Sequence, residues 1–139
     1  MVRYLKGSEV EQLLDMSQAI ALMERAFRDL ADGAAVDSPR RRSRMPGKTV
    51  HIMQALAPRM GVAGYKAGYS RGPGHVHMYD FDSGAYEAMI ESDWLGRMRT
   101  AATTAVATRL MARNDASVVA CFGLGRHGIH LGRVDEVDA

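Results

Sequence analysis

The middle of the chain constrains the fold most, because it is a series of short apolar segments separated by turn residues and flanked by helical patterns. The segments run from Val50 to Ala55, Gly64 to Tyr69, Val76 to Phe81 and Ala85 to Ile90. Asp82-Ser83-Gly84, between the last two, has the composition of a hairpin turn. Proline and glycine separate the others at residues 46–47, 58–61 and 71–74. Short strands joined by turns and accompanied by helices predict an antiparallel sheet in an α+β fold.

The first 35 residues predict helices. Ser8 with Glu11, and Asp15 with Gln18, each have the spacing of a capping box. Apolar residues then recur at the spacing of one helical face: Ile20, Met23, Phe27 and Leu30. We expect this face to pack in the core. Gly33 follows it at the position of a left-handed helix cap.

A further helix is predicted from Ser92 or Asp93, either of which could cap it, to about Arg113. Its apolar side is marked by Leu95, Met98, Ala102, Ala105 or Val106, and Leu110. The run that follows, Ser117 to Phe122, is continuous and β-prone, which is typical of a strand buried on both faces. Cys121 lies in this run and is therefore expected to be a buried, inert residue.

Composition describes an ordinary globular chain and excludes several functions. The 139 residues suit one domain, and 47% of them are hydrophobic. The 18 basic residues exceed the 16 acidic ones by only two, so nucleic acid is not an expected partner. No run of about 18 apolar residues occurs, so neither a membrane span nor a membrane partner is expected. A single cysteine excludes an intrachain disulfide and favours a reducing, cytoplasmic location.

The sharpest local motif is the glycine-rich run Gly123-Leu124-Gly125-Arg126-His127-Gly128, directly after the β-prone segment. In dinucleotide-binding folds, glycines at this spacing make a tight turn and let the backbone approach a pyrophosphate. A glycine-rich turn at the end of an ordinary strand is the alternative. A helix and an acidic residue about 20 positions on should follow such a motif, but only eleven residues remain.

Three sets of cationic residues are candidates for binding an anion. Arg40 to Arg44 holds four arginines, whose planar groups bind carboxylate or phosphate, although a solvated loop or edge strand is the alternative. Lys66 lies in a strand-like run flanked by glycines, where a buried lysine could act as an acid, a base or a carboxylate partner. Arg99 precedes a run of small residues on the predicted helix. Both side chains could instead simply face water.

Two histidines offer a weaker possibility. His75 and His77 would point to the same side of a strand, with Asp80 nearby. Zinc sites usually need a third or fourth protein ligand, and none stands at a recognisable spacing. We therefore predict no metal site.

These features, in this order, resemble the ornithine cyclodeaminase/mu-crystallin family from Leu5 to about Gly128. The marks of the resemblance are the helix Ala19 to Phe27, Pro39-Arg40, Met53 at a strand end, Gly64-Tyr65-Lys66, the signature Arg99 to Ala105, Asp115-Ala116 and Gly123-Leu124-Gly125. The resemblance implies a substrate-binding and dimerisation domain over residues 1–115. It also implies the truncated start of an NAD- or NADP-binding Rossmann domain over residues 116–139.

The resemblance further implies a homodimeric, NAD(P)-dependent enzyme that transfers hydride at the α-carbon of a small amino or imino acid. Conversion of ornithine to proline with release of ammonia is the expected reaction. Alanine dehydrogenase, ketimine or imine reductase, or a non-catalytic module for carboxylate binding and dimerisation are the alternatives. Because the catalytic aspartate and most of the nucleotide site of the family would lie further on, the 139-residue chain is expected to be inactive alone.

By resemblance, Arg40, Lys66 and Arg99 would surround the substrate carboxylate, with Lys66 also catalytic and close to the reacting carbon. Arg42 could take the place of Arg40, since the register of the arginine run is open. Cofactor phosphates would lie near Thr100 and the amides of Gly123, Leu124, Gly125, Arg126 and His127. The family commonly has glutamine at the position of His127, which puts nucleotide affinity in doubt.

Overall fold

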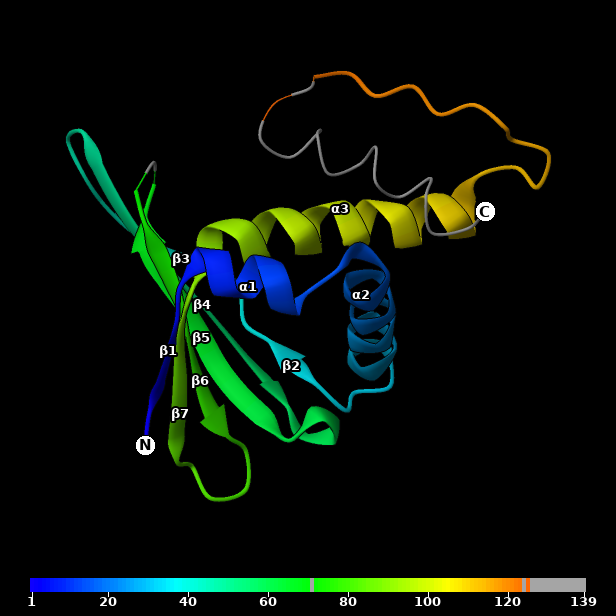
Figure 1. The fold of residues 1–139 in the computed structure, drawn as a ribbon. Coiled ribbons are helices and arrows are strands. Elements are labelled where there is room, and N and C mark those ends of the chain that lie inside the picture. Colours follow the sequence, from blue (N-terminus) through cyan, green and yellow to red (C-terminus); the bar gives the residue numbers. More distant parts are fainter. Residues whose placement is uncertain (71, 124, 126–139) are drawn as a thin grey trace.

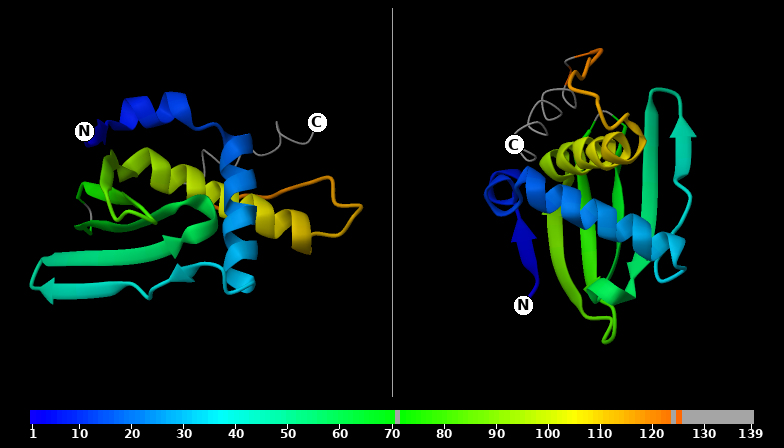
Figure 2. Two further views of the ribbon diagram at one scale, coloured as in Figure 1. Left: turned by 90° about the horizontal axis from the view of Figure 1, so that it is seen from below. Right: turned by 90° about the vertical axis from the view of Figure 1, so that its right-hand side faces the viewer.

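The computed structural model describes residues 1–70, 72–123 and 125. It is a mixed helix-and-sheet fold with its helices to one side of the sheet (Figures 1 and 2). The helices are α1 (Gly7–Leu13), α2 (Met16–Ala31), α3 (Ser92–Met111) and the short 3-10 helix η1 (Pro58–Met60). The strands are β1 (Arg3–Leu5), β2 (Val36–Asp37), β3 (Arg41–Met45), β4 (Lys48–Ala57), β5 (Val62–Tyr69), β6 (Gly74–Asp80) and β7 (Tyr86–Glu91).

The strands form one seven-stranded sheet in the order β1-β7-β6-β5-β4-β2, with β3 also paired to β4. All pairs are antiparallel except β1 with β7. The hairpin between β6 and β7 turns at Gly84 (φ 68°), and the Asp80 carboxylate accepts the N–H of Ser83 at 2.8 Å. The predicted antiparallel strands and their turns are confirmed. The helical expectation for residues 1–35 was wrong for β1, because its pairing with β7 is a contact between distant parts of the chain.

Local capping signals were right at one helix and wrong at two. At α2, Gln18 N–H donates to Asp15 Oδ1 at 2.7 Å and Asp15 N–H donates to Gln18 Oε1 at 3.1 Å, which confirms the capping box. The Ser8 box is not formed, because α1 begins earlier, with Glu91 Oε2 accepting the Gly7 N–H at 2.7 Å. Glu91 is also the N-cap of α3, in place of the predicted Ser92 or Asp93.

The packed core lies where α2 and α3 cross (Figure 2). It is built from Met16, Ala19 and Ile20 of α2 and Met98, Ala101, Ala102, Ala105 and Val106 of α3. Small side chains on α3 let the helices approach closely. The predicted core stripe was only half right, because Phe27 is 42% exposed and Leu30 is 38% exposed. Leu110 on α3 is 72% exposed, since the two helices diverge on either side of their crossing.

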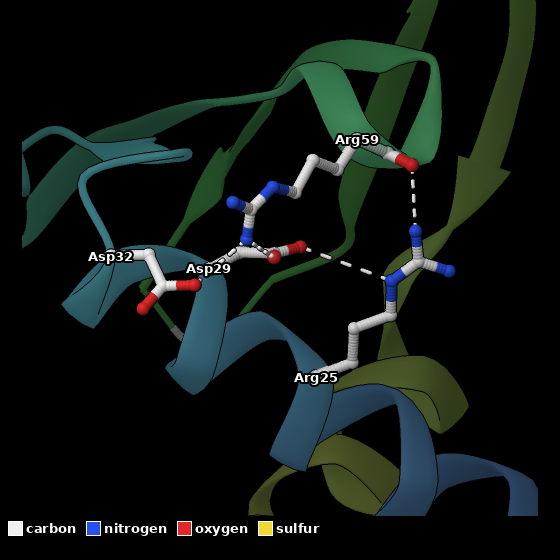
Figure 3. Close-up of polar contacts among 4 residues, drawn as sticks. All are labelled: Arg25, Asp29, Asp32 and Arg59. Carbon is white, nitrogen blue, oxygen red and sulfur yellow. Dashed lines mark hydrogen bonds and ion pairs between the residues drawn. The ribbon is translucent and has the colours of Figure 1, made fainter.

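A buried carboxylate fixes the far end of α2 to the turn between β4 and β5 (Figure 3). Arg59 Nη1 in η1 donates to Asp29 Oδ1 at 2.9 Å and to Asp32 Oδ2 at 2.8 Å. Arg25 Nη2 donates to the Arg59 carbonyl at 2.6 Å, and its Nε lies 3.9 Å from Asp29 Oδ2. Because Asp29 is buried, this pairing offsets the cost of removing its charge from water.

The run Ser117–Phe122 is not a buried strand in this structure. It is exposed coil, with Val118 84% and Phe122 98% exposed, and Cys121 is exposed as well. A strand needs neighbours to take up its backbone hydrogen bonds, and no described segment pairs with this run. Leu124, Arg126, His127 and residues 128–139 lie outside the described residues, so the division at residue 115 stays a prediction. No helix in the described part of the chain could cross a membrane.

Candidate functional site

A cavity of about 560 Å³ lies between the helix-facing side of the sheet and the first turns of α3. Arg40, Met53, Lys66, Gly96 and Arg99 are among the residues that line it. They come from the segment before β3, from β4, from β5 and from α3. The structure therefore brings together the three cationic residues that the sequence analysis selected.

Lys66 is the most enclosed of the three cations. It pairs with Met53 of β4 and Val76 of β6, in the middle of the sheet. Its Nζ lies 3.4 Å from the position that a Cβ on Gly96 would occupy, so this helical glycine leaves room for the ammonium group. The pKa of Lys66 is lowered, first by burial and then by the charges of Arg99 and Arg40. An ammonium group held among other cations attracts an anion strongly.

The register left open by the arginine run is settled by the pairing of β3 with β4. Arg40 stands just before β3, and its Nε donates to Met53 Sδ at 3.1 Å, which directs the guanidinium toward the cavity. Arg42 pairs with His51 and is not among the residues that line this cavity. Met53 lies in the middle of β4, and not at a strand end as expected.

The cavity carries an excess of positive charge. No ion pair joins Arg40, Lys66 or Arg99 to a carboxylate among the described residues, although Asp37 also lines the cavity. Cations brought together without a counter-ion repel one another, and a bound anion relieves that repulsion. Two guanidinium groups and one ammonium group suit a carboxylate, which they can bind by charge-assisted hydrogen bonds.

The residues predicted to bind a cofactor are less fully placed. Thr100 follows Arg99 on α3, and its hydroxyl donates to the Gly96 carbonyl at 2.7 Å. Gly123 has φ 91°, a conformation that favours glycine, and there is open space around both Gly123 and Gly125. These two glycines lie in exposed coil, with no helix N-terminus beside them among the described residues. The described residues by themselves therefore do not build a dinucleotide cradle.

One residue on the cationic side of the sheet was missed by the sequence analysis. His51 lies two positions before Met53 on β4, and so on the same face of the strand. A second cavity, of about 660 Å³, is lined by His51 and Arg97 and shares Lys66, Gly96 and Arg99 with the first. His51 lies two residues before Met53, and residues two apart on a strand share a face, so this spacing could have identified His51 as a residue of the site.

The paired histidines take part in aromatic contacts on the other face of the sheet. His77 Nδ1 lies 2.9 Å from the Tyr86 hydroxyl, and the His77 ring stacks on Tyr65 at 4.5 Å. His75 lies 6.3 Å from Tyr4, between ring centroids. Within residues 1–70, 72–123 and 125, no group of three or more histidine, cysteine, aspartate or glutamate residues could hold a metal ion.

Sequence comparison gives the family. The sequence model of the ornithine cyclodeaminase/mu-crystallin family matches residues 3–130. The chain belongs to the ornithine cyclodeaminase/mu-crystallin family. The chain is also 31% identical to a protein of Rhizobium meliloti (strain 1021) named as a dehydrogenase, over 89% of this chain and 42% of that protein.

Solved structures agree with the family assignment. A probable ornithine cyclodeaminase from Bordetella pertussis Tohama I matches with a TM-score of 0.92 at 26% identity, over 96% of this chain and 44% of that chain. An archaeal alanine dehydrogenase dimer with bound NAD matches at 0.91 and 25% identity, over 98% and 45%. The Δ1-pyrroline-2-carboxylate reductase of Thermococcus litoralis, in complex with NADH and L-proline, matches at 0.88 and 25% identity, over 99% and 46%. This family member thus spans less than half the length of these relatives.

Proposed function

We propose that this chain supplies the substrate-binding side of an NAD(P)-dependent enzyme that acts on a small amino or imino acid. The observation that carries the proposal is the cavity in which Arg40, Lys66 and Arg99 converge without an ion-pair partner among the described residues. Ornithine conversion to proline with release of ammonia, alanine oxidation and ketimine or imine reduction all need an α-carboxylate held in this way. The family assignment makes this reaction class the natural one.

In this proposal the two arginines hold and orient the carboxylate, while Lys66 has a second task. In the proposal, its ammonium group also lies beside the carbon next to the carboxylate. When hydride adds to the imine carbon, the electron pair of the C=N bond moves onto the nitrogen, and the ammonium group can stabilise that charge or donate a proton to it. A lysine whose pKa is lowered by burial and by neighbouring cations also releases a proton more readily than an exposed lysine.

A nicotinamide dinucleotide would supply the hydride transfer when bound. Support for NAD or NADP comes from the relatives that were solved with NAD and NADH. Thr100 and the glycine-rich run, with Leu124, Arg126 and His127 among its members, are the residues of this chain that we propose for the phosphates. Because the described residues do not form a binding site for the dinucleotide, carboxylate binding tests the proposed function more directly than cofactor binding does.

Titration of the 139-residue chain with L-proline and with L-prolinamide, followed by NMR or calorimetry, tests the proposal. The two ligands have the same ring and amine, and differ only in the carboxylate. We expect L-proline to bind and L-prolinamide to bind at least ten times more weakly. Equal affinities for the two ligands would contradict carboxylate recognition. In an assay with NAD⁺ and L-ornithine or L-alanine we expect no turnover by the 139-residue chain alone, and robust turnover would contradict the proposed division of the site.

We also propose that the chain forms a homodimer through the sheet face that the helices leave open. Residues on this face alternate with Lys66, and include the stacked Tyr65 and His77. Ile52 (38% exposed) and Leu56 (45% exposed) lie on the same face of the neighbouring strand. Exposed aromatic and aliphatic side chains on a sheet favour association, and one relative was solved as a dimer.

Sedimentation equilibrium checks the dimer. Leu56→Glu places a charge on the open face, and we expect it to raise the dimer dissociation constant at least tenfold. Leu110→Glu is the matched control, because Leu110 is 72% exposed and lies on α3, away from that face. If both variants associate as the unaltered chain does, the open face is not the interface.

A further inference from the structure

The two cavities beside Lys66 form one site with two lobes. They share Lys66, Ser92, Gly96 and Arg99, so a carboxylate held by the two cations lies at their junction. The second lobe extends from that junction toward His51 and Tyr69. Its size, about 660 Å³, leaves room for the side chain of an amino acid whose α-carboxylate is anchored at the junction.

The residue paired with His51 is a glycine, and the neighbouring backbone leaves no room for a larger residue there. His51 pairs with Gly68 of β5, and Lys66 is its diagonal neighbour on the same face. A Cβ on Gly68 would lie 2.7 Å from Gly74 Cα and 2.9 Å from the Pro73 carbonyl oxygen, so the backbone leaves no space for a side chain at this position. The imidazole of His51 therefore faces a lobe that no side chain of residue 68 fills.

The charges around this lobe are nearly all positive. Burial lowers the pKa of His51, and the charges of Arg40, Lys66 and Arg42 lower it further. Asp93 is the one carboxylate that lines the lobe among the described residues, and it is ion-paired with Arg97. The lobe thus offers cations and an imidazole, and Asp93 is ion-paired with Arg97 while its charge also acts on Lys66.

These charges select among substrates that share an α-carboxylate. A second ammonium group, as in a diamino acid, would lie near Lys66 and Arg99, which line the lobe. The charges of Arg40 and Arg42 also act on His51, so like charges would repel that ammonium group. A second carboxylate would be attracted by the same cations and could accept an N–H from the imidazole. An uncharged side chain would be neither repelled nor attracted by these cations.

We propose that the substrate is an amino or imino acid with a second carboxylate, which lies in the lobe lined by His51. This inference rests on the proposed function, because it takes the α-carboxylate to be anchored by Lys66 and Arg99. It narrows that function from small amino and imino acids in general to acidic ones. His51 is then a residue that determines specificity.

Titration of the 139-residue chain with L-aspartate, L-alanine and L-ornithine tests this proposal, since the three ligands differ only in the side chain. We expect L-aspartate to bind at least ten times more tightly than L-alanine, and L-ornithine to bind more weakly than L-alanine. His51→Glu should reverse the order of L-aspartate and L-ornithine. His75→Glu, on the opposite face of the sheet, is the matched control and should keep the original order.

The outcomes separate the two proposals. If L-alanine and L-aspartate bind equally well, or L-ornithine binds best, the acidic-substrate inference is wrong while the carboxylate anchor stands. If none of the three binds, and L-proline also fails to bind, the proposed function itself is wrong. The comparison of ligands on the unaltered chain decides the inference even if His51→Glu fails to fold.

Discussion

Lys66→Met is expected to weaken the binding of L-proline by about 10- to 100-fold. The change keeps most of the apolar length of the side chain and removes the ammonium group that lines the first cavity together with Arg40 and Arg99. A hydrogen bond to a charged group contributes about 1.5–3 kcal/mol, and each 1.4 kcal/mol changes an affinity about tenfold. Calorimetric titration of the variant and the unaltered chain measures the effect.

The same variant should not lose stability at neutral pH. In the folded chain the pKa of Lys66 lies below its ordinary value of 10.5, so the charged form is disfavoured by folding. That penalty is present below the folded pKa and is relieved as the pH rises toward 10.5. We therefore expect Lys66→Met to have a melting temperature at pH 7 at least equal to that of the unaltered chain, with the difference shrinking at high pH.

Lys48→Met is the control for both measurements, because Lys48 is exposed at the start of β4 and lines neither cavity. It should leave L-proline affinity and melting temperature unchanged. Undiminished L-proline binding by Lys66→Met would remove Lys66 from the site. A large drop in its melting temperature would show that the lysine stabilises the fold.

Gly64→Ala is expected to cost about 1–3 kcal/mol of unfolding free energy, or more, although it adds a single methyl group. A Cβ on Gly64 would lie 2.4 Å from the His77 carbonyl oxygen, which belongs to the backbone of β6. Two paired strands cannot separate locally without lengthening their hydrogen bonds, and Gly64 pairs with both Ala55 and Met78. Because Gly64 also lines the first cavity, L-proline binding should fall as well.

Urea unfolding at constant pH measures this change, and Gly125→Ala is the matched control. Gly125 has open space where a Cβ would lie and does not have a left-handed backbone, so its substitution should change the unfolding free energy by less than about 0.5 kcal/mol. Equal unfolding free energies for Gly64→Ala and Gly125→Ala would mean that β5 and β6 pack less closely than the structure shows.

Patterns that depend on neighbouring residues were predictable. The capping box of Asp15 and Gln18, the turn at Gly84 and the antiparallel strands follow from backbone preferences and from the alternation of side chains. The start of α1 was not predictable in this way. It is set by a hydrogen bond between Gly7 and Glu91, which lie 84 positions apart in the chain.

By itself, the sequence determined which side chains could bind an acid: Arg40 or Arg42, Lys66 and Arg99. Only the tertiary structure decided that Arg40 is the arginine directed toward the first cavity. It also decided that His51 lines the second cavity, which adjoins the first. The reason is physical. Residue types and local spacing fix charge and backbone preference, whereas the cavity arises from the register of β3 on β4 and from the placing of α3 over the sheet. Both depend on contacts between residues far apart in the chain.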